Sequence, residues 1–409
     1  LCVMGCFCVS CAPKADPYKD AIKDIIVKAE VPLIQLESNF NGERLSYQIE
    51  NPNFYDSVKI AAGTATPKPA VFQAASLSKV VFAYIVMKMY DRGEIDLDAP
   101  ICTYTDIDRF EDKESASKLT ARMVLNHRTG LPNWSTSPSS QEWPTSTITF
   151  KYPVDSCYGY SGEGFAFLQR AVEKIRGKKI DDIAKEEVFQ PLGMEYTSYE
   201  WQPMYDTLAV DGYNKEGENR GKGRHPRANV GYTLRTCAAD YAKFLQALLD
   251  GTGLSPQTKE VFFTPCSEKA VRYAGNHRKS DDSIAWAMGI GTEDNAEFGK
   301  VLWHWGDNGS FKALFIVIPS ANGYLTYFTN SNHGHDIIND ITALIIKNQT
   351  PDVRQQKTKG PLNYSRIINV MNENIEKNLS AAELASLCGL SLSNLKKIFK
   401  NYSGVGVMD

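Results

Sequence analysis

The sequence contains 409 residues, of which 43% are hydrophobic, 11% aromatic and 23% charged, and its formal net charge at pH 7 is −3. This composition is typical of a globular protein and excludes disordered and collagen-like classes, and the small net charge gives the whole protein no attraction to nucleic acids or anionic membranes. Because a single hydrophobic core stops growing at about 250–300 residues, the length predicts one large domain with an appendage.

The first eleven residues are apolar apart from Ser10 and precede a polar stretch, so we interpret residues 1–20 as the remainder of a secretion signal. Val9-Ser10-Cys11 resembles the end of a bacterial lipoprotein signal, in which the cysteine is lipidated. The sequence therefore predicts a lipid anchor at Cys11 and a location in the cell envelope, periplasmic or lipid-anchored. The alternatives are a plain signal, or a hydrophobic start of no consequence in a cytoplasmic protein.

From about residue 17 onward, short β-like runs alternate with longer helical ones, which predicts a mixed α/β domain at residues 21–349. No apolar run reaches the roughly 18 residues that cross a bilayer, so no integral membrane span is expected. Two adjacent strands joined by a turn with glycine and asparagine are expected at residues 314–318 and 324–329. Helices are expected at residues 80–90, 165–174, 239–249 and 337–346.

Nine cysteines are present, four of them among the first eleven residues, and the other five are scattered without the spacing of metal ligands. We therefore expect neither a disulfide framework nor a metal site, and no cofactor. His333-Gly334-His335 is a single histidine pair without a carboxylate or cysteine pattern around it, so it does not change this expectation.

Ser76-Leu77-Ser78-Lys79 places a lysine three residues after a serine, at the start of an apolar run. Positions i and i+3 share a face of a helix, so the amine is expected beside the hydroxyl. Partial burial lowers the pKa of a lysine, and a neutral amine accepts the serine proton and generates a nucleophile. Residues 115–118 and 393–396 have the same S-x-x-K spacing, and the first of these lies among charges. The alternative for residues 76–79 is an ordinary helix start with a surface lysine.

Five phrases, in this order, resemble the family of class C β-lactamases, D-alanyl-D-alanine carboxypeptidases and esterases. They are FQAASLSK (72–79), GEIDLDAP (93–100), LTARMVLNHRTGLP (119–132), YGYSGEG (158–164) and HWG (304–306). The resemblance implies a β-lactamase/transpeptidase-like domain, an antiparallel sheet flanked by helices with an all-helical lobe. It also implies a serine hydrolase that acts through an acyl-enzyme on a peptide, amide or ester, with β-lactam hydrolysis left open.

The same resemblance implies roles for individual residues. Ser76 is the acylated nucleophile and Lys79 helps to remove its proton. Tyr160 lies near Ser76 and, as phenolate or as a relay, takes the serine proton and protonates the leaving group. A phenolate of ordinary pKa near 10 needs the lysine nearby to stabilise it. Packing in the core is the alternative for Tyr160.

The phrase at residues 304–306 implies the other wall of the cleft. His304 begins this strand and binds the substrate carboxylate or carbonyl, followed by Gly306, and the backbone N–H of Asp307 forms an oxyanion hole with that of Ser76. A histidine between two tryptophans is equally well explained as a buried packing residue.

One departure from the family pattern concerns substrate choice. The family's asparagine after the tyrosine, which hydrogen-bonds substrate and lysine, is here Gly162. Either Glu163 supplies the polar oxygen, which makes it a candidate substrate-binding residue, or the site has lost β-lactam turnover. Peptidase or esterase activity is therefore favoured over lactamase activity. His127, within the third phrase, is expected to fix a turn and not to act as a base.

The polar segment at residues 350–363 is interpreted as a linker, and residues 364–409 as a small all-helical module. Ser380 with Glu383 forms a predicted capping box, Gly389 a tight turn, and Ser391 caps a second helix. This pattern resembles the first helix-turn-helix of the AraC/XylS transcription regulators, which normally carry two such units. Residues 351–409 hold eight Lys/Arg and five Asp/Glu. The candidate DNA contacts are Ser393, Asn394, Lys396 and Lys397.

Binding of DNA through one such unit is expected to be weak, and a helical packing module or a truncated fusion is the alternative for the tail. Two functions follow from the whole sequence. The first is an envelope serine hydrolase, with a small-molecule or peptide substrate and a vestigial tail. The second is a cytoplasmic DNA-binding regulator whose hydrolase-like domain senses a ligand without turnover.

Overall fold

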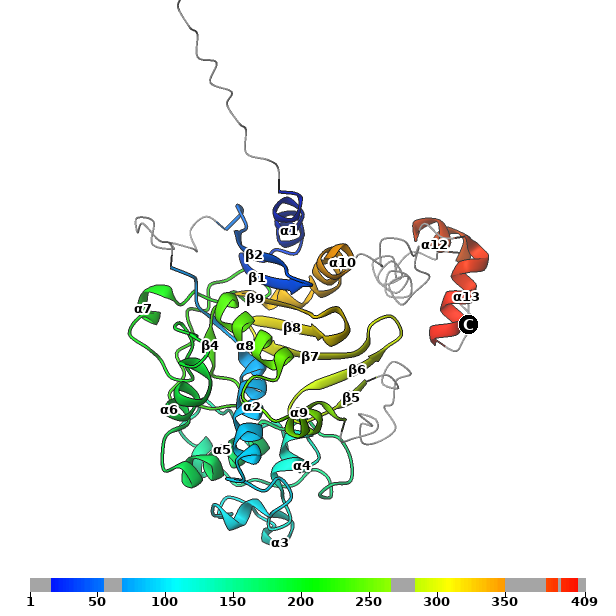
Figure 1. The fold of residues 1–409 in the computed structure, drawn as a ribbon. Helices are drawn as coiled ribbons and strands as arrows, with labels where there is room; N and C mark the ends of the chain where they lie inside the picture. Colours follow the sequence, from blue (N-terminus) through cyan, green and yellow to red (C-terminus); the bar gives the residue numbers. More distant parts are fainter. Residues whose placement is uncertain (1–15, 55–67, 266–283, 350–379, 389–390, 404–409) are drawn as a thin grey trace, which may run out of the picture.

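The computed structural model describes residues 16–54, 68–265, 284–349, 380–388 and 391–403 (Figure 1). Its centre is a seven-stranded antiparallel sheet in the order β2-β1-β9-β8-β7-β6-β5. The strands are β1 Leu33–Phe40, β2 Glu43–Glu50, β5 Ile284–Trp286, β6 Gly291–Asn295, β7 Gly299–Asp307, β8 Lys312–Ile318 and β9 Gly323–Thr329. Strands β3 (Phe72–Gln73) and β4 (Arg235–Thr236) form a separate pair.

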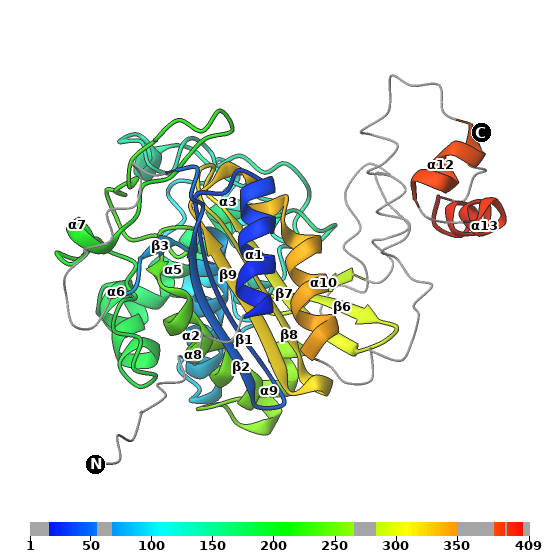
Figure 2. The ribbon, with the colours of Figure 1, turned by 90° about the horizontal axis from the view of Figure 1, so that it is seen from above.

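Helices cover both faces of the sheet. On one face, α1 (Pro17–Lys28) and α10 (Ile338–Gln349) lie side by side (Figure 2) and bury Leu325 and Tyr327 of β9. On the other face, α8 (Ala238–Asp250) packs on β9, whose Tyr324 and Phe328 belong to the larger core. Side chains of a strand alternate between its faces, so β9, with every residue buried, stabilises two cores at once.

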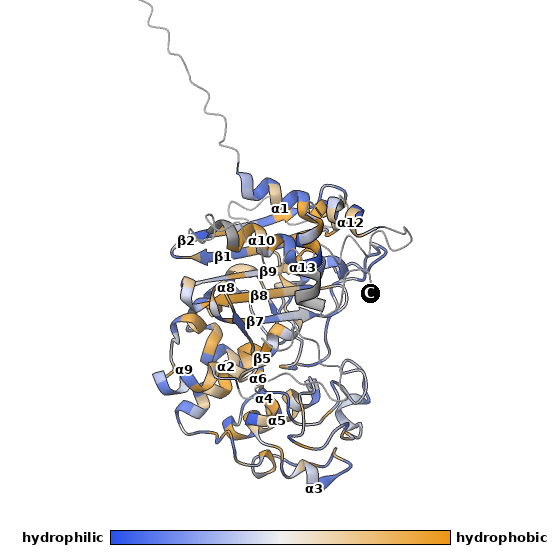
Figure 3. Ribbon diagram, turned by 90° about the vertical axis from the view of Figure 1, so that its right-hand side faces the viewer, coloured by the Kyte–Doolittle hydropathy of each residue, from blue (hydrophilic) through white to orange (hydrophobic). Residues whose placement is uncertain are grey.

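Helix α2 (Ser78–Asp91) runs through the larger core, and nearly all of its residues are buried. A helix that is apolar on all sides is stable only when it is enclosed, and residues 80–87 meet this condition. In Figure 3, strand β8 also has the orange colour of hydrophobic residues. The other helices are α3 Lys113–Ala116, α4 Ala121–Leu125, α5 Gly162–Arg176, α6 Ile180–Ala184, α7 Tyr205–Leu208, α9 Pro256–Phe263, α12 Ala381–Leu387 and α13 Leu392–Ser403.

The predicted mixed α/β class, with an antiparallel sheet flanked by helices, is confirmed. The helices expected at 80–90, 165–174 and 239–249 correspond to α2, α5 and α8, and the two expected strands to β8 and β9. Their turn ends at Asn322, whose φ of +42° is left-handed, a conformation that asparagine tolerates. Among the described helices, none combines the length and the apolar character needed to span a membrane.

The tail is described only in part. Its first helix, α12, begins with the predicted capping box, in which the Glu383 backbone N–H donates to the Ser380 hydroxyl (3.3 Å) and the Ser380 N–H donates to the Glu383 carboxylate (2.8 Å). The predicted turn at Gly389, the linker at 350–363 and the lipidation site at Cys11 lie outside the described residues.

Candidate active site

Ser76 lies in a tight turn between β3 and α2. The turn is the short 3-10 helix η1, Ala75–Leu77, and Ala75 has a φ of +49°, which costs free energy for a residue with a Cβ. Ser78 stabilises the turn, because its hydroxyl donates to the Ala75 carbonyl (2.5 Å) and accepts from the Leu234 N–H (3.1 Å). Within residues 71–80, Ser76 alone is partly exposed and all the others are buried. The Ser76 hydroxyl is therefore accessible from a turn whose neighbours are packed in the core.

Lys79 follows one helical turn later, and only 1% of it is exposed. Its Nζ lies 3.4 Å from the Ser76 Oγ and donates to the carbonyl of Gly231 at 2.6 Å. Burial disfavours the ammonium form and lowers the pKa of Lys79 to about 7. Near neutral pH a large fraction of Lys79 is therefore a neutral amine beside a serine hydroxyl, which is the arrangement a proton acceptor needs.

Tyr160 completes this group just before α5. The ring lies 4.8 Å from the Lys79 Nζ, measured to its centroid. Its buried hydroxyl faces Ser76 without a well-aligned hydrogen bond, and burial raises its pKa although the Ser76 hydroxyl lowers it. A raised pKa keeps the phenol protonated, so of the two groups Lys79 is the better proton acceptor. The raised pKa favours the relay role of Tyr160 over the phenolate role.

Two histidines enclose Tyr160. The ring of His127 lies 4.3 Å from that of Tyr160, and its Nδ1 accepts from the Ser161 N–H at 3.1 Å. The φ of His127 is +58°, and burial lowers its pKa well below 6.5. His127 is thus a neutral, fully buried residue that orients the backbone beside Tyr160.

The environment of His304 differs from the one that the sequence analysis expected. It is 2% exposed, its Nδ1 lies 2.7 Å from the Trp305 carbonyl, and it does not line the cavity described below. Burial lowers its pKa to about 3, so the ring is neutral at physiological pH. The Trp305 carbonyl can only accept, so the single proton of the neutral ring lies on Nδ1, and Nε2 has no N–H to donate to a substrate carboxylate or carbonyl. The geometry therefore favours the alternative, a histidine packed against Tyr160 and Trp286.

Gly306 allows β7 to approach the nucleophile turn. A Cβ at this position would overlap the Ala74 carbonyl oxygen and would lie 3.2 Å from the Ala75 Cβ. Asp307, one residue further, lines the cavity, and its carboxylate pairs with the Nζ of Lys312 at 2.5 Å. The end of β7 therefore lies next to Ser76, as the oxyanion-hole hypothesis requires.

A cavity of about 360 Å³ opens directly over Ser76 and Lys79. Its volume suits a small molecule or a short peptide segment. The lining combines aromatic rings with amides, hydroxyls and one exposed arginine: Gln73, Ser76, Lys79, Asn133, Trp134, Pro138, Ser139, Arg220, Gly221, Gly223, His225, Gly231, Tyr232, Asp307, Asn308, Ser310 and Phe311.

Residues 58–347, which include this entire site, match the family model described as Beta-lactamase. The chain belongs to the β-lactamase family. Penicillin-binding protein 4 of Amycolatopsis lactamdurans is 29% identical over 140 residues, which are 32% of this chain and only 37% of that protein. A class C β-lactamase mutant has the same fold, with a TM-score of 0.66 at 16% identity over 81% of this chain and 96% of that one. So does a D-stereospecific amidohydrolase from Streptomyces sp., with a TM-score of 0.63 at 16% identity over 81% and 99% of the chains.

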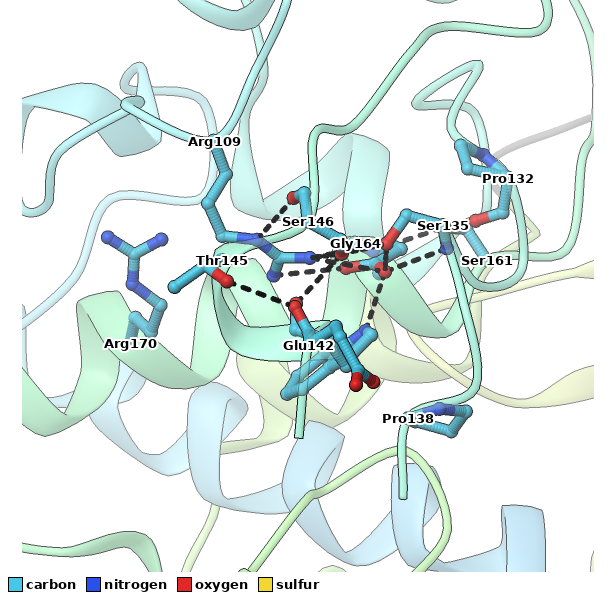
Figure 4. Close-up of polar contacts among 12 residues, drawn as sticks. Arg109, Pro132, Ser135, Pro138, Glu142, Thr145, Ser146, Ser161, Gly164 and Arg170 are labelled. Atoms are coloured by element: carbon cyan, nitrogen blue, oxygen red, sulfur yellow. Dashed lines mark hydrogen bonds and ion pairs between the residues drawn. The ribbon is translucent and has the colours of Figure 1, made fainter. Parts of the chain in front are cut away.

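Within this β-lactamase-family site, Glu163 does not take the place of the missing asparagine. It is fully buried and is not among the residues that line the cavity. Its Oε1 accepts from the Ser135 N–H (2.9 Å) and the Trp143 indole N–H (2.7 Å), and its Oε2 lies 3.3 Å from the Arg109 guanidinium. Hydrogen bonds also join Arg109, Ser135 and Ser146 to one another (Figure 4). The geometry therefore does not favour a substrate-binding role for Glu163, because its carboxylate belongs to this buried network.

The sequence analysis did not identify some residues of the site. The Gly231 carbonyl that holds Lys79 lies 152 positions along the chain from it. Gln73 and Asn308 connect the two sides of the cavity floor, where the Asn308 amide donates to the Gln73 Oε1 at 2.7 Å. Trp134 forms part of one wall. Only Gln73 belongs to a phrase that the resemblance singled out.

Proposed function

We propose that this member of the β-lactamase family is a serine hydrolase that acts through an acyl-enzyme on an ester, amide or peptide bond. One observation carries the proposal: a hydroxyl at the floor of a cavity, 3.4 Å from the amine of Lys79, whose pKa burial lowers to about 7. Burial of a charged amine costs free energy of folding, and titratable groups with strongly shifted pKa values are concentrated at functional sites.

The proposed reaction has two halves. The neutral Lys79 amine takes the proton of Ser76 as the Oγ attacks the carbonyl carbon, and the backbone N–H groups of Ser76 and Asp307 stabilise the oxyanion. As the bond to the leaving group breaks, the proton passes through the Tyr160 hydroxyl to the leaving atom, giving an acyl ester of Ser76. Water then attacks this ester, one proton returns to Ser76, and the acid is released.

The substrate preference that we propose is ester or peptide over β-lactam, because Gly162 has no amide to offer. On the wild-type protein, we expect hydrolysis of a short-chain p-nitrophenyl ester and weak or absent turnover of the cephalosporin nitrocefin. A D-alanyl-D-alanine peptide tests the peptidase branch. Peptide mapping after trapping with an activated ester should find one acyl group, on Ser76.

Nitrocefin turnover within about tenfold of a typical enzyme kcat of about 10 s⁻¹ would overturn the preference but not the mechanism. Absence of any acylation by esters, peptides or β-lactams would overturn the proposed function. The regulator hypothesis gains no support from the comparisons.

For the tail, we propose one AraC-type helix-turn-helix unit at residues 364–409, dispensable for catalysis and too sparsely basic for specific DNA binding. The exposed Ser393, Lys396 and Lys397 of α13 are the candidate contacts, with Asn394 partly exposed. Useful affinity usually needs two reading units or more phosphate contacts. We also propose lipidation at Cys11 and a location in the cell envelope.

A chain ending near residue 349 should keep its ester hydrolysis rate, because Ser76, Lys79 and Tyr160 all precede the linker. In fluorescence anisotropy, the full chain and the shortened chain should bind duplex DNA equally weakly. Loss of acylation on truncation, or nanomolar binding of one duplex sequence by the full chain alone, would make the tail functional.

A further inference from the structure

The space beside Gly162 is filled by the indole ring of Trp134. A Cβ built at Gly162 would lie 2.6 Å from the Trp134 Cε2 and closer still to two other ring atoms. At Gly231, whose carbonyl holds Lys79, a Cβ would lie 2.8 Å from the Trp134 Cη2. Real Cβ atoms do not approach so closely, so the ring fits only because both positions are glycine. The polar side chain expected at 162 is thus replaced by an aromatic ring from another segment.

Trp134 belongs to a built wall of the cavity. Its ring meets that of Tyr232 edge to face, with centroids 5.5 Å apart, and Tyr232 meets His225 in the same way at 4.8 Å. We call Trp134, Tyr232 and His225 the aromatic wall; all three line the cavity over Ser76. Burial lowers the pKa of His225 to about 4, so the wall carries no charge at neutral pH.

The buried Glu163 holds this wall in place from behind. Trp143, whose indole N–H donates to Glu163, lies edge to face with Trp134 at 5.9 Å. The backbone N–H of Ser135, next to Trp134, donates to the same carboxylate oxygen. The indole is therefore fixed by its neighbours and by its own backbone, as a preorganised binding surface requires.

We propose that Trp134 determines substrate specificity and that the aromatic wall binds a flat apolar substituent next to the scissile carbonyl of an ester or amide. The proposal rests on the proposed function and specifies its substrate class. A ring face attracts another flat apolar group through buried area and edge-to-face contact, whereas an asparagine at 162 would have offered an amide to a polar one. The wall stands next to the carbonyl that holds Lys79, so a substituent against it keeps its carbonyl near Ser76.

The test compares p-nitrophenyl phenylacetate with p-nitrophenyl acetate, which share a leaving group and differ in the acyl substituent. The wild type should prefer the phenylacetate, and Trp134→Ala should reduce the ratio of the two kcat/KM values about tenfold, mainly through KM for the aromatic ester. Trp134→Phe should retain most of the ratio. Trp305→Ala, which removes a tryptophan that is 47% exposed and does not line the cavity, is the matched control. An unchanged ratio in Trp134→Ala would overturn the proposal.

A second measurement needs no turnover. Calorimetric titration of phenylacetamide into the Ser76→Ala protein should show binding that Trp134→Ala weakens and Trp305→Ala leaves unchanged. If the wild type is never acylated but this binding depends on Trp134, the proposed function is contradicted and the binding role of the aromatic wall is supported. If Ser76 is acylated but neither the kcat/KM ratio nor the binding depends on Trp134, only the proposed role of the aromatic wall is contradicted.

The pair of positions provides a further check on the geometry. Gly162→Asn should lower the melting temperature, because its Cβ and the indole claim the same space. In the Trp134→Ala background the same substitution should lower it much less. Equal losses in the two backgrounds would show that the ring does not occupy this space and would contradict the proposal.

Discussion

Replacement of Ser76 by alanine should abolish acylation. Of Ser76 and Lys79, only Ser76 has a hydroxyl that can form the acyl ester. Removal of a nucleophile that acts as one unit with its base typically reduces kcat by about 10⁶-fold. Intact mass after incubation with an activated ester or a fluorophosphonate should rise by one adduct in the wild type and remain unchanged in Ser76→Ala.

The chain offers two matched controls for Ser76→Ala. Ser115 and Ser393 share the S-x-x-K spacing, but Lys118 pairs with the exposed Glu114 at 2.8 Å, and Ser393 is itself exposed. Neither serine has a buried amine beside it, because Lys118 and Lys396 are both exposed, so Ser115→Ala and Ser393→Ala should be labelled like the wild type. An adduct that survives in Ser76→Ala, or disappears in a control, would contradict the assignment.

Lys79→Met should reduce the acylation rate by about 10²–10⁴-fold, the usual contribution of a positioned proton acceptor. Methionine fills a similar volume without a titratable group, and the buried position favours an apolar side chain, so folding should be retained. Single-turnover acylation by p-nitrophenyl acetate measures the rate, and the melting temperature checks the fold.

The pH dependence of the same reaction identifies the group. The neutral amine is the acceptor and burial lowers the pKa of Lys79 to about 7, so acylation should rise as pH increases through about 7 and level off above it. Tyr160, with a raised pKa, does not titrate in this range. In Lys79→Met the inflection near 7 should disappear; if it persists, another group controls acylation.

The parts of the site that the sequence predicted depend on local geometry. Ser76 and Lys79 are one helical turn apart, so a four-residue pattern is enough to place amine beside hydroxyl. Strands β8 and β9 were predictable for a similar reason. Strand β8 is apolar after its first residue, β9 is rich in aromatic residues and threonine, and Asn322 and Gly323 mark the turn between them.

The parts that the sequence did not predict depend on distant partners. Glu163 looked like a cavity residue because it follows Gly162, but Arg109 and Ser135, 54 and 28 positions away, bind its carboxylate. His304 is buried through contacts with Tyr160 and Trp286, which no spacing within its own phrase reveals. Trp134 was missed because its role arises from two glycines in other segments.

The strand order also constrains when the protein can fold during synthesis. Strand β1 lies between β2 and β9, with Ile34 paired to Thr329, so the sheet cannot close until almost 300 later residues have been translated. Contacts this distant along the chain form slowly. Until then the β1–β2 hairpin exposes an unpaired edge, which is prone to aggregate and is a natural target for chaperones. Because Gly306 of β7 must reach the turn at Ser76, a nascent chain that stops short of β7 has its nucleophile but no complete site.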